Sequence, residues 1–536
     1  MKLDKVLETI GGFGKYQKFQ FFLAALPTIV VGFHQLVAVF LNATPEFRCT
    51  HNSTDESFEF NLASLSYNFS AIESYDPCVD YSSSFGNQIV SEPCQKFVYS
   101  KEYFSKTIVT EWDLVCEENF KSTLSTMLYM AGSLIGNLVF GILSDVIGRK
   151  KAMVLAMVLL ILFGFGAAFS PYYYLFAVLR MGVGGCATGL YMCLFVIAME
   201  LVGKQYRVYI GVAVRYFYTT GFVILTGIAY LSKDWFYTQI ATTAPALLFL
   251  SYIWLVPESA RWLLSKERTA EASEVVSRAA RMNGVALPDD FSLEQDTSVS
   301  KASLSEVLKK GRTLFARALI LCVTWASGCA GYYGLSLNSG NIGGNIYTNF
   351  LLSVVVEFIS YTVCLSINKL GRKKLCISGL LIAGSACIAT VLVDHFVEDD
   401  AQLNGYHIAL NVVGKFGLSI SHCTIYVWAA ELYPTTLRNS LLGLNATMGR
   451  IGQILAPLVN DIGNFVPEKY SKMLSPAIIG TSVILSGLLT FLLPETAGRK
   501  LPETIEEANV FPRQLEAKED DFKKAVGPLD DAQTKI

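Results

Sequence analysis

The sequence predicts an all-α polytopic membrane protein, in which twelve transmembrane helices form two six-helix bundles and both termini are cytoplasmic. Of its 536 residues, 52% are hydrophobic and only 16% are charged, whereas about 25% are charged in ordinary soluble domains. The apolar residues also form long blocks, such as 318–356 and 375–393, that contain no Asp, Glu, Lys or Arg. A membrane-spanning helix needs roughly 20 such residues. Basic segments recur at matching places in the two halves of the chain.

The positions of the spans follow from these blocks. The block 318–356 is long enough for two helices, and the Gly and Asn residues of NSGNIGGN, at 338–345, favour a turn that divides it. We expect spans at 19–41, 123–144, 151–170, 172–197, 208–231, 235–256, 314–336, 344–368, 374–394, 406–430, 438–462 and 474–494.

Basic residues indicate the orientation of these spans. Lys and Arg cluster at 149–151, 204–207 and 369–374, and ten more lie within 257–317. By the positive-inside rule these segments are cytoplasmic, which leaves both termini on that side. The first twenty residues are too polar for a cleaved secretory signal, so we expect the first span to serve as an uncleaved one.

Four parts of the chain follow from this topology. They are an N-terminal six-helix bundle at 1–256, which includes a large extracellular loop at 42–122; a cytoplasmic linker with amphipathic helices at 257–313; a C-terminal six-helix bundle at 314–494; and a mostly disordered cytoplasmic tail at 495–536.

The extracellular loop carries the features of a secreted segment. Four cysteines outside the cell favour two disulfides, for which three connectivities are possible. Asn52 and Asn68 lie in acceptor triplets and are the predicted glycosylation sites. Asn42 also lies in such a triplet, but its closeness to the membrane and to Pro45 speaks against a glycan there. The four candidate disulfide cysteines are Cys49, Cys78, Cys94 and Cys116.

Several motifs occur twice, in the same order. GILSDVIGRKK at 141–151 returns as CLSINKLGRKK at 364–374, and ELVGKQYR at 200–207 returns as ELYPTTLR at 431–438. LVPES and LLPET, and the cations Arg180 and Lys415, follow with nearly the same offset. We infer that a six-helix unit has been duplicated. Two such halves can enclose a site near the middle of the membrane and open it to either side by rocking.

The charged residues of the repeated motifs are candidates for a cytoplasmic gate. Asp145 can accept hydrogen bonds at a helix end or from a cation of the other half, and Arg149 can meet the negative C-terminal end of a neighbouring helix. In the alternative interpretation these cations only fix the topology. The predicted gating residues are Asp145, Arg149, Glu200, Arg207, Arg372, Glu431 and Arg438.

The segment 141–151 resembles the motif G-x-x-x-D-x-x-G-R-[KR]-[KR] of the major facilitator superfamily. More narrowly, the chain is similar to the organic cation, carnitine and organic anion carriers, and among them to insect organic-cation-transporter-like proteins. TEWDLVC at 110–116, PESARWL at 257–263, YYGLSLNSGNIGGNIYTNF at 332–350 and ELYPTTLRN at 431–439 carry this resemblance. The second copy of the first motif departs from it, because Cys364 replaces Gly and Asn368 replaces Asp. The resemblance implies transport of small organic ions by alternating access at the plasma membrane.

Polar residues within the spans are the candidates for substrate contact. Glu357 lies in a polar stripe on one span, where an isolated charge costs roughly 2.5–3.5 kcal/mol unless it faces a cavity or a partner; the matching acid lines the substrate path in the cation and carnitine branches of the resemblance. Arg450 matches an arginine of the carnitine and anion carriers and can hold a carboxylate bidentately. Arg215 is either a second anion contact or a partner of Glu200 or Glu357. The predicted substrate-binding residues are Glu357, Arg450, Arg215, Trp325, Tyr332, Tyr333, Tyr218 and Gln453.

The predicted function is therefore secondary active or facilitative transport of small organic cations or zwitterions of the carnitine or amine type across the lipid bilayer. The alternatives are a polyspecific organic anion exchanger and a non-transporting receptor or scaffold on the same fold. Na⁺ and H⁺ are both open as coupling ions, and Thr534 and Ile536 resemble the end of a PDZ-binding peptide. We expect no enzyme activity, cofactor, metal or nucleic-acid partner, since the sequence has no phosphate-binding loop and no metal-spaced His and Cys cluster.

Overall fold

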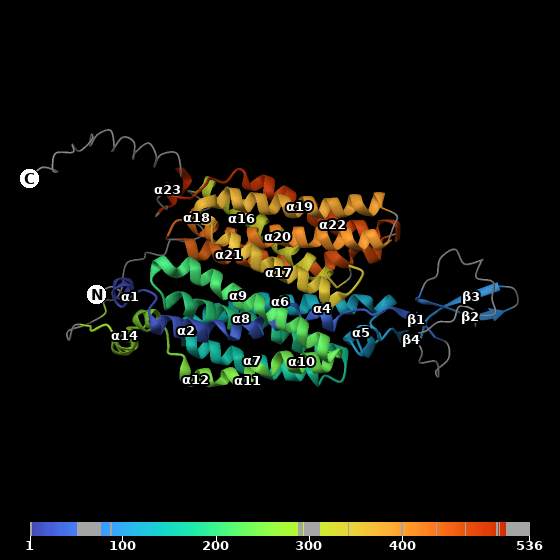
Figure 1. Cartoon of the computed structure of the whole chain (residues 1–536), viewed down its shortest axis with the longest axis horizontal. Helices are drawn as coiled ribbons and strands as arrows, with labels where there is room; N and C mark the ends of the chain where they lie inside the picture. The colour runs from blue at the N-terminus through green and yellow to red at the C-terminus, as the bar shows by residue number, and fades with distance from the viewer. Residues whose placement is uncertain are drawn as a thin grey trace, which may run out of the picture.

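Two bundles of long helices make up the molecule, which is a computed structural model. Figure 1 shows α2 to α12 of the first half and α16 to α22 of the second half as two bundles that lie side by side. Short helices α1, α14 and α23 lie at one end of the long axis, and the four strands lie at the other. The structure describes residues 3–50, 77–85, 88–287, 293, 311–340, 342–397, 400–435, 437–466, 468–499, 502 and 504–510.

Proline breaks the first and sixth spans of the first half into shorter helices. Pro27 and Pro245 each stand at the first position of a new helix, where the missing N–H of proline is tolerated. The helices of this half are α2 (Lys15–Ala25), α3 (Pro27–Leu36), α4 (Ala38–Leu41), α6 (Asn119–Ile147), α7 (Arg149–Ala168), α8 (Tyr173–Glu200), α9 (Arg207–Ser232), α10 (Trp235–Thr243), α11 (Pro245–Leu248) and α12 (Tyr252–Leu255).

The second half repeats the arrangement with fewer breaks. Its helices are α16 (Arg312–Asn338), α17 (Ile346–Cys364), α18 (Ile367–Leu370), α19 (Arg372–Phe396), α20 (Asp400–Leu432), α21 (Arg438–Asp461) and α22 (Glu468–Thr490). The remaining elements are α1 (Leu3–Thr9), α5 (Ile108–Glu111), α13 (Ala260–Ser265), α14 (Thr269–Asn283), α23 (Ile505–Val510) and four short turns of 3₁₀ helix at 116–118, 204–206, 249–251 and 462–465.

Eleven helical segments within the described ranges are long and apolar enough to cross a membrane. The predicted span at 438–462 coincides with α21, which is not among the eleven. Its polar face explains this, because Arg450, Gln453 and Asn460 all lie on this one helix. The helical membrane architecture is confirmed, although the loop after the first span also contains strands, whereas the count of twelve spans and the cytoplasmic termini stay predictions.

Glycines let the helices within each half approach closely. A Cβ atom at Gly132 of α6 would stand 1.9 Å from the carbonyl oxygen of Met181 on α8, and one at Gly452 of α21 would stand 2.0 Å from that of Ala326 on α16. Small residues at helix crossings are typical of membrane bundles, where close packing of backbones replaces the hydrophobic effect. Both halves therefore depend on glycine at a crossing.

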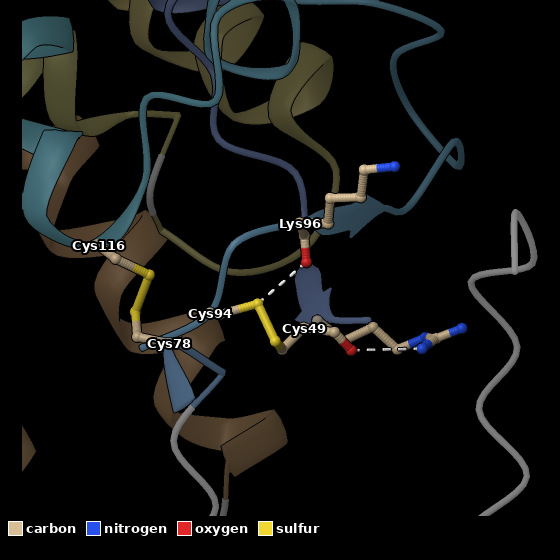
Figure 2. The surroundings of a disulfide bond; sticks show 6 residues. Cys49, Cys78, Cys94, Lys96 and Cys116 are labelled. Carbon is tan, nitrogen blue, oxygen red and sulfur yellow. Dashed lines mark hydrogen bonds between the residues drawn. A yellow bond between two sulfur atoms is a disulfide. The ribbon is translucent and has the colours of Figure 1, made fainter. Parts of the chain in front are cut away.

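The loop after the first span is held by two disulfides, Cys49–Cys94 and Cys78–Cys116 (Figure 2). Its strands are β1 (Phe47–Cys49), β2 (Val79–Phe85), β3 (Gln88–Pro93) and β4 (Phe97–Tyr99), and β1 pairs antiparallel with β4 while β2 pairs with β3. The structure thus selects one of the three possible connectivities.

Of the three asparagines of this loop that lie in acceptor triplets, only Asn42 belongs to the described residues. The side-chain amide of Asn42 donates hydrogen bonds to the Ser122 carbonyl at 2.8 Å and to the Ser125 hydroxyl at 2.9 Å, so it is engaged inside the fold. Asn52 and Asn68 lie outside the described residues, as do Thr534 and Ile536 at the end of the chain.

Candidate functional site

The two halves meet along two pairs of helices, α6 with α21 and α9 with α17. Near the end that carries the strands, the Thr123 hydroxyl of α6 donates to the carboxylate of Asp461 on α21. Between α9 and α17, the hydroxyls of Tyr216 and Thr362 share a hydrogen bond at 2.8 Å. Polar contacts therefore cross between the halves along the length of the interface, and the candidate substrate residues lie among them.

Glu357 of α17 is fully buried and has four protein partners. Its Oε1 lies 2.9 Å from the ammonium of Lys415 and accepts a 2.7 Å hydrogen bond from the Tyr332 hydroxyl. Its Oε2 accepts from the hydroxyls of Thr219 at 3.2 Å and Tyr361 at 3.3 Å. Thr219 belongs to the other half, so the carboxylate joins the two bundles. The polar stripe predicted this residue, but its ion-pair partner on α20 lies 58 residues further along the chain, where no local pattern links the two.

Arg215 of α9 reaches across to the second half. Its guanidinium lies 5.4 Å from the ring centre of Tyr426 and 5.9 Å from that of Tyr361. The expected partners are wrong: Glu200 is bound by Arg149 and by Ser259, and Glu357 is bound by Lys415. Among the described residues no carboxylate pairs with Arg215.

Arg450 of α21 is the second cation in this region without an acidic partner among the described residues. Its Nη1 donates a 2.7 Å hydrogen bond to Oε1 of Gln453, one turn along the same helix. The amide of Gln453 in turn donates to the sulfur of Met130 in the first half, at 2.7 Å. Trp325 lies between the two helices that carry these arginines: its ring packs on Tyr426, which Arg215 faces, and a Cβ atom at Gly449, next to Arg450, would lie 3.3 Å from the Trp325 ring.

The aromatic candidates are buried to different degrees. Trp325, Tyr332 and Tyr333 of α16 are buried, and the ring of Trp325 packs on Tyr426 with 4.2 Å between centres. Tyr218 of α9 is half-buried and packs edge-on against Tyr191 and Phe222.

Tyr426 itself was not predicted from the sequence. Its ring is 42% exposed although Trp325, His422 and Arg215 surround it. No signal in the sequence separates it from the other 25 tyrosines, because it lies within an apolar run like many of them.

The gating candidates of the first half form one network within that half. Arg149 binds Asp145 at 2.6 Å and lies 3.5 Å from Glu200. Glu258, which the sequence did not single out, accepts a 3.1 Å hydrogen bond from the backbone N–H of Lys150 at the start of α7. Asp145 thus pairs with a cation of its own half.

The second half repeats this network with other residues. Arg372 binds Glu431 at 3.0 Å, and Glu495 accepts from the backbone N–H groups of Arg372 at 3.1 Å and Lys373 at 3.0 Å. Glu258 and Glu495 belong to the repeated LVPES and LLPET segments, which was the signal that could have found them.

The remaining two candidates bind other groups. Arg207 binds Asp4 at 3.0 Å, and Arg438 donates to the carbonyl of Tyr433 at 3.2 Å. Each contact stays within its own half of the chain: Asp4 lies in α1, before the first bundle, and Tyr433 directly follows α20 in the second half.

The carboxylates of Glu258 and Glu495 each lie at the start of a helix, beside a glycine. Gly148 and Gly371 have φ values of 109° and 86°, which L-residues rarely adopt, and a Cβ atom at either would lie within 2.7 Å of the neighbouring carboxylate. A carboxylate at a helix N-terminus is stabilised by the free N–H groups and by the helix dipole. Burial acts to raise the pKa of Glu495, but backbone hydrogen bonds outweigh it and hold the pKa below its usual value.

Comparison with known proteins shows the family to which this chain belongs. The family model "Sugar (and other) transporter" matches residues 58–508. The chain is 37% identical to the organic cation transporter protein of Drosophila melanogaster over 533 residues, with 95% of each chain covered. It is 33% identical to the human organic cation/carnitine transporter 2, covering 94% of this chain and 93% of that one.

Solved structures support the same fold. The proton:xylose symporter XylE, bound to a bromodeoxyglucose, matches with a TM-score of 0.58 and 18% identity, over 92% of this chain and 98% of that chain. An inward-open form of XylE from E. coli matches equally well, at 16% identity. At this level of identity the likeness concerns the fold alone. The chain belongs to the sugar-and-other-transporter family of the major facilitator superfamily and is a membrane transporter, not an enzyme.

Proposed function

We propose that the protein transports small organic zwitterions, which carry both an ammonium and a carboxylate, by alternating access. One observation carries this proposal: Arg215 and Arg450, both within membrane spans, have no acidic partner among the described residues, while the carboxylate of Glu357 is already neutralised by Lys415. An anionic group on the substrate would supply the missing partner. The relatives named for organic cations and for carnitine support the ammonium.

The carboxylate of such a substrate would bind the two arginines. Hydrogen bonds between a guanidinium and a carboxylate are charge-assisted and contribute about 1.5–3 kcal/mol. Gln453 holds Arg450 in place, so in this proposal it is a positioning residue.

The ammonium would bind aromatic rings and not a free carboxylate. A cation above an aromatic face gains about 0.5–2 kcal/mol, depending on its desolvation. Tyr426 offers a partly exposed ring, and Tyr218 is a second, half-buried ring among these aromatic residues. In this proposal Glu357 acts on binding indirectly, because it positions the ammonium of Lys415 and the hydroxyls of Tyr332, Thr219 and Tyr361.

Alternating access would use the duplicated gates at one end and the Thr123–Asp461 contact at the other. The gate residues pair within their own halves, around Arg149 and Arg372, so each bundle can move as one body. The proposal includes the twelve-span topology, the domain boundaries and cytoplasmic termini; the plasma-membrane location and coupling to Na⁺ or H⁺ stay predictions.

A second candidate function is exchange of organic anions. Three cations within the spans, Arg180, Arg215 and Arg450, have no acidic partner among the described residues, and a fourth, Lys415, pairs with Glu357. This excess of positive charge favours a substrate with at least one negative group and speaks against a simple cation.

Uptake of three labelled compounds tests the proposal: a zwitterion such as carnitine, a quaternary cation without a carboxylate, and a carboxylate without an ammonium. Arg450→Ala and Arg215→Ala should each lower uptake of the zwitterion about tenfold or more, as the loss of a charge-assisted bond requires, and leave the cation unaffected. Arg268→Ala on α14 is the matched control, since that arginine pairs with Glu271 on the surface. Equal losses for zwitterion and cation in the two variants contradict the proposal, and preferred uptake of the simple carboxylate selects the second candidate.

A further inference from the structure

Arg180 of α8 is a buried cation without a counterion in the part of the chain that the structure describes. Its side chain is 3% exposed, and its guanidinium lies 4.6 Å from the ring centre of Tyr129 on α6. It makes no hydrogen bond or ion pair with a described residue, and its Nη1 is fully buried.

Two neighbours share this lack of partners. His34 of α3 is fully buried, and neither ring nitrogen has a hydrogen-bond partner; the hydroxyl of the buried Tyr129 has none either. The helices that carry the three side chains pack together, because α8 contacts both α3 and α6, and the guanidinium of Arg180 lies over the ring of Tyr129. Three helices of the first half therefore bring four unpartnered polar atoms together.

The duplicated half offers an internal comparison. Lys415 is the counterpart of Arg180 in the repeat, and its ammonium lies 3.4 Å from the ring centre of Tyr332. The same cation-on-tyrosine arrangement thus occurs twice. In the second half Glu357 neutralises the cation at 2.9 Å, whereas the first half supplies no acid among its described residues.

An unpaired cation within a membrane span is costly. An arginine at the centre of a membrane helix costs roughly 2.5–3.5 kcal/mol by insertion scales, and buried charges are almost always paired. The groups present at the site are donors: the guanidinium N–H, the tyrosine hydroxyl and one imidazole N–H. What they lack is an acceptor with a negative charge.

We propose that Arg180, His34 and Tyr129 form a binding site for a small monovalent anion. The anion accepts hydrogen bonds from all three side chains and takes the place that Glu357 has in the other half. It comes either from solution, as chloride, or from the substrate, as its carboxylate. Only the second source rests on the function proposed above.

Thermal unfolding of the purified full-length protein in detergent tests the first source. Chloride is titrated against gluconate at constant ionic strength, without substrate. The melting temperature of the wild type should rise with chloride and saturate, and Arg180→Lys, which keeps the charge, should respond in the same direction. Arg180→Gln should lose the response. His34→Asp should lose it as well, because the new carboxylate supplies a counterion beside Arg180.

A second titration, with a carboxylate-bearing zwitterion in gluconate, tests the other source. If chloride has no effect on the wild type, the zwitterion should raise its melting temperature, and Arg180→Gln should weaken that binding about tenfold or more. Arg450→Ala separates the two proposals: loss of the zwitterion response with an intact chloride response supports the anion site and leaves it independent of the substrate site.

The proposal is overturned if Arg180→Gln and the wild type respond alike to both anions. It is overturned equally if His34→Asp keeps the full response of the wild type to whichever of the two anions stabilises the wild type. This second comparison decides the matter even where Arg180→Gln fails to fold.

Discussion

Lys415 and Glu357 form an ion pair of 2.9 Å in the interior of the second bundle, and the ammonium of Lys415 lies 3.4 Å from the ring centre of Tyr332. Both side chains are almost completely buried. The pair neutralises the carboxylate of Glu357 within the protein. In the function proposed above, the substrate therefore meets arginines and not a free acid.

Removing one partner of this pair should destabilise the protein more than removing both. Glu357→Gln or Lys415→Met alone leaves a buried charge without a counterion, which costs about 3–5 kcal/mol. The double variant Glu357→Gln/Lys415→Met should recover most of that loss. Thermal unfolding in detergent measures all three, and a double variant as unstable as the sum of the single ones would show that the two charges act independently.

Gly452 should tolerate no side chain, because its hydrogen atoms face the Ala326 carbonyl at the crossing of α21 and α16. Gly452→Ala forces the helices apart and should cost about 1–3 kcal/mol, as overpacking does. Gly443 on the same helix has no atom within 4 Å of a Cβ position and provides the matched control. Surface expression and melting temperature should fall for the first variant and stay level for Gly443→Ala; equal effects would place the crossing elsewhere.

Glu495 should stabilise the second bundle only while it is ionised. Because backbone N–H groups lower its pKa in the folded protein, its contribution is complete above the pKa of the unfolded chain and is lost as pH falls through the folded value. Glu495→Gln should therefore lower stability by about 1 kcal/mol at neutral pH, the size of a helix-terminus effect.

The difference in stability between wild type and Glu495→Gln should depend on pH. The difference in melting temperature between wild type and Glu495→Gln should stay constant from about pH 7 to about pH 5 and shrink below about pH 4, because the lowered pKa keeps Glu495 ionised in the folded protein below the usual range. Glu506→Gln, an exposed acid on α23, is the control and should show little difference at either pH. A gap that does not shrink below about pH 4 would mean that the charge of Glu495 contributes nothing.

A cross-link between α6 and α21 should trap the arrangement seen here. Thr123→Cys with Asp461→Cys places two thiols where a hydrogen bond now joins the halves, and the eight cysteines outside the two disulfides are buried. Oxidation should form a bond and stop transport, and reduction should restore it. Gly141→Cys with Gly443→Cys, on the same two helices where neither glycine has a close neighbour, should not cross-link. Transport that continues through a formed Thr123–Asp461 cross-link would exclude rocking at this contact.

The spans could be predicted from the sequence because a charge-free block of 20 residues has few other uses. The repeat was also visible, since its motifs keep their order along the chain, and the organic ion carrier family followed from them. The breaks at Pro27 and Pro245 shifted the helix ends without changing the number of segments in the first half.

The charge pairing could not be predicted, because it depends on how helices far apart in sequence turn toward each other. Glu200 and Glu357 were equally available partners for Arg215 in the sequence, and the fold gives both to other cations. The exposure of Tyr426, at 42%, likewise depends on how the folded helices pack and not on its neighbours in the chain.

The most direct test of the central claim compares uptake of one zwitterion with uptake of its methyl ester, which lacks only the negative charge, in proteoliposomes. Wild-type protein should prefer the zwitterion by about tenfold or more, because the ester leaves the guanidinium groups of Arg215 and Arg450 without a charged acceptor. In Arg450→Ala the preference should fall toward one. A wild type that takes up both equally well, or a preference that survives in Arg450→Ala, would contradict the account.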